Sequence, residues 1–158
     1  MSRRVFIVAL ALLSGLTVAS AVAQSRSAVS NQPIMLGADH GGATNNGFNL
    51  RGRVEITQGQ NRLRANAILG AGDGDGLETV TATGDVYYVT PTETIRGDRA
   101  VYTLSNATIV VTGDVILTQG ENVLTGGSLT YNVDTGAAEM SGGAGRIRGV
   151  FYPNSNRN

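Results

Sequence analysis

The sequence predicts an all-β fold made of repeated units, and three observations support this prediction. A seven-residue phrase occurs at Gly52–Gln58, Gly84–Thr90 and Gly113–Gln119, with its glycines 32 and 29 residues apart. The phrase alternates apolar and polar residues, which is the pattern of a β-strand with one buried face. The chain also has 22 glycines and only 3 prolines among its 158 residues. A period of this length is typical of stacked supersecondary units that cannot bury their apolar faces alone.

The N-terminus has the pattern of a secretory signal peptide. Arg3 and Arg4 precede an apolar run over residues 5–18, and Ala21-Val22-Ala23 supplies the small residues of a cleavage site. The run is shorter than the ~20 residues of a typical membrane span, although an uncleaved N-terminal anchor is the alternative. We therefore expect cleavage of residues 1–23 after Ala23 and export of the mature chain. Residues 24–32 are polar and are expected to be disordered.

Composition excludes several classes of function. The chain has no cysteine, no lysine and a single histidine, so it cannot form disulfide bonds or build a zinc site from several His or Cys ligands. Its 12 arginines balance 12 acidic residues, and no basic stripe suggests a nucleic-acid partner. We expect no cofactor.

The repeat can be followed by offset from the glycine of each phrase. Apolar residues occupy even offsets from four before the glycine to four after it, while their odd neighbours are mostly polar, so one face of each strand is apolar. A turn follows, and offset plus thirteen is always small: Ala65, Gly97 and Gly126. A small residue there indicates a corner or bulge. Each unit is expected to contribute three or four strands of about five residues.

The array begins and ends inside a unit. Residues 34–39 match the second half of a unit, and Ser141-Gly142 starts a further copy that degrades into glycines. Residues 146–153 read as a last strand that ends at Pro153. No polar cap is visible at either end, and open edge strands invite pairing with another chain. Residues 41–47 and 70–76 are glycine-rich and are expected to be loops.

Residues that could carry chemistry are few. His40 is expected to be an exposed loop residue, and a nucleophile scheme needs a histidine. Asp73 and Asp75 could ligate Ca²⁺, but the motif is short and a flexible hairpin loop explains it equally simply. Outward carboxylates on separate units leave a carbohydrate-active β-solenoid enzyme as a weak alternative. We predict no enzyme, no catalytic residue and no metal site.

The apolar face is therefore the candidate for function. It mixes large residues such as Phe48 and Leu117 with small ones such as Ala82 and Ala100. A thin, incompletely filled interior between two layers of strands would leave a groove with open ends, which would suit an acyl chain. A structural or adhesive β-solenoid without ligand is the alternative.

The phrases Gly113–Asn122 and Leu124–Asn132, with the order and spacing of the repeat, resemble the OstA-like family over residues 33–153. Within that family the chain is most similar to the periplasmic bridge proteins of lipopolysaccharide transport. The resemblance implies a single-domain, twisted open β-jellyroll of short antiparallel strands whose apolar groove holds the acyl chains of lipid A. It also implies periplasmic localisation and end-to-end assembly. The partners would be copies of the chain itself, a membrane-anchored inner-membrane component and an outer-membrane barrel component with related domains.

The implied site residues fall into two sets. The groove would be lined by the even-offset apolar residues: Phe48, Leu50, Val54, Ile56, Leu63, Ile68, Val80, Val86, Tyr88, Ile95, Tyr102, Ile109, Val111, Val115, Leu117, Leu124, Leu129, Tyr131 and Met140. The assembly edges would be formed by Ile34, Leu36, Ala38, Ile147, Val150, Phe151 and Tyr152. Residues 154–158 would form a polar tail. The inner-membrane and outer-membrane components are the close alternative identities for this chain. The inner-membrane component would keep a longer uncleaved helix, and the outer-membrane component would continue into a large barrel.

Overall fold

The structure is a computed structural model that describes residues 32–73 and 76–153. The predicted signal peptide, most of the polar segment after it, Asp75 and the polar tail lie outside the described residues. The strands are β1 (Ile34–Gly37), β2 (His40–Thr44), β3 (Gly47–Gln58), β4 (Asn61–Asp73), β5 (Gly76–Val89), β6 (Glu93–Thr103), β7 (Thr108–Gln119), β8 (Asn122–Asn132), β9 (Ala138–Ser141) and β10 (Arg148–Val150), with one 3-10 turn, η1 (Leu104–Asn106), between β6 and β7. In the part of the chain that is described, no helix is long and apolar enough to cross a membrane.

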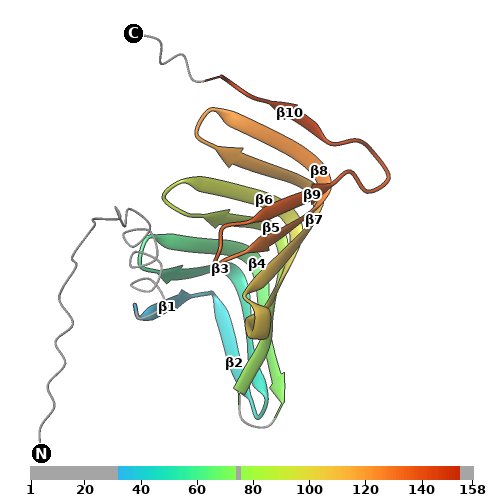
Figure 1. Cartoon of the computed structure of the whole chain (residues 1–158). Coiled ribbons are helices and arrows are strands. Elements are labelled where there is room, and N and C mark those ends of the chain that lie inside the picture. The colour runs from blue at the N-terminus through green and yellow to red at the C-terminus, as the bar shows by residue number, and fades with distance from the viewer. Residues whose placement is uncertain (1–31, 74–75, 154–158) are drawn as a thin grey trace, which may run out of the picture.

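The strands form one ten-stranded antiparallel sheet in chain order (Figure 1). Six long strands, β3 to β8, pair each with the next through a ladder of hairpins. At the N-terminal end both β1 and β2 pair with β3, and at the C-terminal end both β9 and β10 pair with β8. Each end of the stack therefore carries two short strands where the middle carries one long strand.

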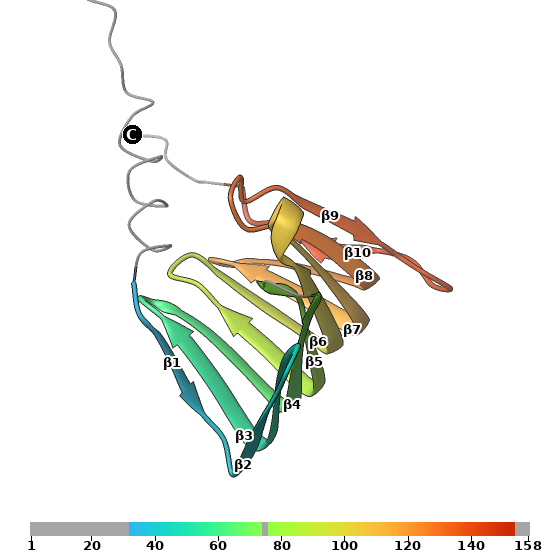
Figure 2. The ribbon, with the colours of Figure 1, turned by 90° about the horizontal axis from the view of Figure 1, so that it is seen from below.

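A register shift near the middle of every long strand bends the sheet into two layers, seen from below in Figure 2. The first layer, leaf A, contains β1, β10 and the segments nearest the hairpin turns at 59–60, 90–92 and 120–121. The second layer, leaf B, contains β2, β9 and the other halves of the long strands. The strand pair β1 and β2 is thus one strand broken at the bend, and so is the pair β9 and β10. Such bends require bulges, because an unbroken ladder cannot change direction sharply.

The glycines of the repeated phrase sit at this bend. Gly52, Gly84 and Gly113 have φ of +77°, +78° and +84°, a conformation that strains any residue with a Cβ. A side chain from the neighbouring segment of the sheet also covers each glycine. A Cβ on Gly52 would lie 2.5 Å from Asp39 Oδ2, and a Cβ on Gly84 would lie 2.6 Å from Asn66 Nδ2. Asp98 covers Gly113 in the same way.

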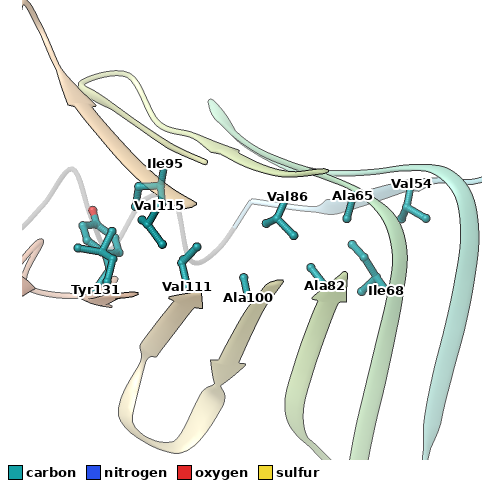
Figure 3. Packing of buried hydrophobic residues seen from close by; sticks show 11 residues of the cluster. Val54, Ala65, Ile68, Ala82, Val86, Ile95, Ala100, Val111, Val115 and Tyr131 are labelled. Atoms are coloured by element: carbon teal, nitrogen blue, oxygen red, sulfur yellow. The ribbon is translucent and has the colours of Figure 1, made fainter. Parts of the chain in front are cut away.

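The core lies between the two leaves. Figure 3 shows Val54, Val86 and Val115 from one layer pointing toward Ile68 and Val111 from the other. These five side chains, together with Ile95 and Leu129, are at most 1% exposed. No charged or polar residue among the described ones is fully buried, as expected for a core formed only by the apolar faces of strands.

Some local expectations from the sequence were wrong. Each unit has two strands of 11 to 14 residues rather than three or four of about five, because the bulge bends a strand without ending it. The expected irregularity at offset plus thirteen is confirmed, because the register shifts of β4 and β6 include Ala65 and Gly97. A second shift lies at the phrase glycine and the residue after it. The small residues at plus thirteen lie opposite it: Gly97 pairs with Val86, and Gly126 pairs with Val115. Most of the expected loop at 41–47 is strand β2.

Candidate functional site

The space between the leaves is the candidate functional site, and its lining changes with distance from the bend. Next to the bend, the side chains that face the interior are mostly buried. They belong to Leu50, Val54, Ile68, Val86, Val111, Val115, Leu129 and Met140, of which Leu50 and Met140, near the two ends of the stack, are half-buried. The part of the predicted groove nearest the bend is therefore closed core.

Farther from the bend, the interior opens toward solvent. The next inward-facing positions are Phe48, Ile56, Leu63, Val80, Tyr88, Ile95, Tyr102, Ile109, Leu117, Leu124 and Tyr131, which we call the mouth residues. Apart from Ile95 and Tyr131, which are buried, they are half-buried. The predicted groove residues thus lie together on the inside of the fold, and most of their accessible apolar surface belongs to the half-buried mouth residues, with Leu50 and Met140 adding some at the two ends of the stack.

Tyrosines gather among the mouth residues. The rings of Tyr88 in leaf A and Tyr131 in leaf B lie with centroids 6.4 Å apart, so the leaves touch there. Burial, with smaller electrostatic contributions from Tyr102 and Glu93, raises the pKa of Tyr88 to about 12. Burial also raises the pKa of Tyr102, with a smaller contribution from Asp134. These phenols therefore stay neutral throughout the physiological range.

A polar row lies beyond the mouth residues of leaf A, at the hairpin turns. Its members face inward by strand alternation and are Gln58, Asn61, Glu93, Gln119 and Asn122. The two ends of the row hold edge segments, because Gln58 Nε2 donates to the carbonyl oxygen of Gln32 (3.2 Å) and Asn122 Oδ1 accepts from the Tyr152 amide (3.0 Å). In the middle, Gln119 Nε2 donates to Glu93 Oε1 over 2.9 Å. The sequence does not predict this row, because its members come together only through the register in which the strands pair.

Most charged side chains lie on the outside. Arg53 at the bend forms a hydrogen-bonded ion pair with Asp39 at 2.5 Å, and this hydrogen bond holds the pKa of the carboxyl below its usual value. On the outer face of leaf A, Arg62 and Arg64 lie 3.7 and 3.2 Å from the carboxylate of Glu55. Exposed pairs of this kind contribute little to stability.

The predicted assembly residues lie at the two edges of leaf A or beside them. Ile34 and Leu36 belong to β1 and are 61% and 56% exposed. Val150 belongs to β10, and Phe151 and Tyr152 follow it at 68% and 58% exposed. Ala38 lies between β1 and β2, and Ile147 precedes β10, so neither is part of a strand. The edges of leaf B, β2 and β9, expose no large apolar side chain.

The residues that could carry chemistry lie apart from one another in the described part of the chain. His40 starts the edge strand β2 rather than lying in a loop, and it is exposed. Asp73 ends β4 and is exposed, while Asp75 is outside the described residues. Within residues 32–73 and 76–153, no three His, Asp or Glu side chains cluster in a way that could hold a metal ion.

Comparison with known families supplies the context for this interior. Residues 38–137 match the model of the LptA/(LptD N-terminal domain) LPS transport protein family, and the match runs from the first bend to the residue before β9. The chain belongs to this family. It is an LptA-type, OstA-like lipopolysaccharide-transport protein, as the sequence resemblance implied. The other members named by the model are transport proteins, not enzymes.

Two relatives illustrate the family. The solved structure of LptH, the LptA-homologous periplasmic component of the lipopolysaccharide transport device of Pseudomonas aeruginosa, superposes with a TM-score of 0.70. It is 24% identical and is matched over 79% of this chain and 99% of LptH, so it supports the fold. An uncharacterized protein of Rhizobium meliloti (strain 1021) is 28% identical over 116 residues. That match covers 67% of this chain and 62% of the length of the relative.

Proposed function

We propose that this LptA-type protein binds the acyl chains of lipopolysaccharide between its two leaves and bridges the inner and outer membranes by end-to-end assembly. The observation that carries the proposal is the gradient across the interior. Most apolar side chains beside the bend are buried, whereas most of those at the mouth are half-buried. Acyl chains lying over the mouth residues would cover apolar surface that water otherwise contacts, at about 25 cal/mol per Å² of area covered.

The edges support assembly of one copy on the next. Strand directions alternate from β1 to β10 along leaf A, so β1 and β10 run in opposite directions. The β10 edge of one copy can therefore pair antiparallel with the β1 edge of another without interrupting the alternation. A contact between two different edges does not close on itself, so repetition produces a filament. The exposed apolar residues of leaf A make its edges the stronger part of this joint.

The location and the partners follow from the same reasoning. Export with cleavage after Ala23 would place the mature chain in the periplasm, the compartment of the LptH component. Both ends of the stack are free edges in the described part of the chain. The inner-membrane and outer-membrane partners with related domains would therefore continue the two leaves at opposite ends.

A site-specific photo-crosslinker tests the lipid site. Placed at Leu117 or Tyr88 on the inside of the mouth, it should capture lipopolysaccharide in the periplasm of cells. Placed at Asp114 or Arg53, which are exposed at the bend, it should not. Equal labelling at inside and outside positions, or no labelling at all, would contradict binding between the leaves.

A further inference from the structure

Glu93 differs from the other carboxylates of the described chain. It is the first residue of β6 and faces the interior two positions before the buried Ile95. Its Oε1 accepts the hydrogen bond from Gln119, whereas its Oε2 is buried and has no hydrogen-bond partner. Among the acidic residues that the structure describes, only Glu55 is also half-buried, and it lies on the outer face beside two arginines.

An unpartnered carboxylate oxygen in such a place is energetically unfavourable. Leaving a buried acceptor without a donor costs about 1–3 kcal/mol, and more for a charged group. A donor brought by a ligand would remove this penalty. Since Glu93 lies just beyond Ile95 and Leu117 of the mouth, a molecule with its acyl chains on those residues would bring its head group to this carboxylate.

The same place offers no cationic side chain to an anion. The chain contains no lysine. Every arginine in the described ranges is exposed, either on an outer face or around the bend: Arg51, Arg53, Arg62, Arg64, Arg96, Arg99, Arg146 and Arg148. A phosphate at the polar row would therefore meet the like charge of Glu93 without a neighbouring cation, which is unfavourable in a partly desolvated site.

We propose that Glu93, positioned by Gln119, selects the head group of the bound lipid. The favoured ligand is a glycolipid whose sugar presents hydroxyl or amide N–H donors next to the acyl linkages, with its anionic groups held away from this row. The inference rests on the proposed acyl site between the leaves and adds the chemical class of head group that the site accepts.

Two amphiphiles with the same chain test the inference: dodecyl maltoside, whose head group carries many hydroxyl donors, and dodecyl phosphate. Binding of each below its micelle concentration would be measured by calorimetry on the mature protein. The native protein should bind the maltoside at least about tenfold more tightly, which corresponds to about 1.4 kcal/mol. Glu93→Gln keeps the shape and removes the charge, so it should reduce this preference about tenfold, chiefly by strengthening phosphate binding.

Glu121→Gln is the matched control, because Glu121 lies in the adjacent hairpin turn and is exposed. It removes the same charge near the mouth and should leave the preference unchanged. An unchanged preference in Glu93→Gln, an equal change in Glu121→Gln, or a native protein that prefers the phosphate would overturn the inference while leaving acyl binding intact. Failure of both amphiphiles to bind the native protein would contradict the proposed function itself.

A second variant keeps the test decisive if Glu93→Gln does not fold. Gln119 is exposed at the end of β7, so a longer side chain can extend into solvent there. Gln119→Arg places a guanidinium beside Glu93, which supplies the missing donor and adds a cation. It should reverse the preference in favour of dodecyl phosphate. Persistence of the native preference in this variant would argue against a role for Glu93.

Discussion

Tyr88 of β5 and Tyr131 of β8 touch across the interior, with ring centroids 6.4 Å apart and ring planes tilted by 59°. The two residues belong to different leaves, so this contact joins the layers at a distance from the bend. Tilted aromatic pairs of this kind contribute about 0.5–1.5 kcal/mol beyond the area they bury. The pair also marks where the leaves would have to separate to admit a ligand.

The buried phenol of Tyr88 makes stability depend on alkaline pH. Its pKa is about 12 in the folded protein, against about 10 for an unfolded tyrosine. The unfolded state therefore loses its proton first, so stability is complete below pH 10 and falls as the pH rises toward 12. Between pH 9 and pH 11.5 the native protein should lose about 2 kcal/mol more than Tyr88→Phe in urea unfolding. Equal losses in the two proteins would show that Tyr88 ionises as freely in the folded state.

The bend should be sensitive to a single methyl group. Gly113→Ala places a Cβ against Asp98 at a φ of +84°, whereas Gly120→Ala also has a positive φ, +60°, but nothing lies within 4 Å of its Cβ. Inserting extra atoms into a packed site forces its neighbours to shift, which typically lowers the free energy of unfolding by about 1–3 kcal/mol. Gly113→Ala should therefore lower the free energy of unfolding by about 1–3 kcal/mol more than Gly120→Ala, measured by urea denaturation. Equal effects would mean that Asp98 moves aside freely.

Two leucines should separate stability from lipid binding. Leu129 is fully buried near the bend, and Leu129→Ala should destabilise the protein by about 2–5 kcal/mol. Leu117 is half-buried at the mouth, so Leu117→Ala should cost about 1–2 kcal/mol but weaken binding of labelled lipopolysaccharide several-fold. Folded Leu129→Ala should bind nearly as well as the native protein. The reverse pattern would place the lipid next to the bend.

The edges of leaf A should control self-association. Phe151→Asp puts a charge on a side chain that is 68% exposed beside β10, so it should abolish concentration-dependent oligomers in sedimentation velocity. Folding stability should change by less than about 0.5 kcal/mol, as for most surface substitutions. Leu69→Asp is the control, because Leu69 is also exposed (53%) but belongs to β4, in the middle of the sheet. Oligomers that survive Phe151→Asp, or that are lost equally in Leu69→Asp, would argue against an edge-to-edge joint.

The inward side of each strand could be predicted from the sequence because strand alternation is local. Val54 and Ile56 alternate with the polar residues Arg53, Glu55 and Thr57, and the structure places both on the inside. The glycine at the start of each phrase was also visible. Its role was not visible, since the side chains that cover these glycines, Asp39 and Asn66 among them, come from neighbouring segments of the sheet and no local pattern predicts them.

Alternation, turn residues and a repeat period were enough to determine an all-β stack with one apolar face, because these properties depend on neighbours within a few positions. The depth at which the interior closes, the contact between Tyr88 and Tyr131, and the inward carboxylate of Glu93 were decided by the tertiary structure. Each depends on where the bulges bend the sheet and on how the two leaves come together. Those distances are set by packing between segments far apart in the chain, about which local patterns contain no information.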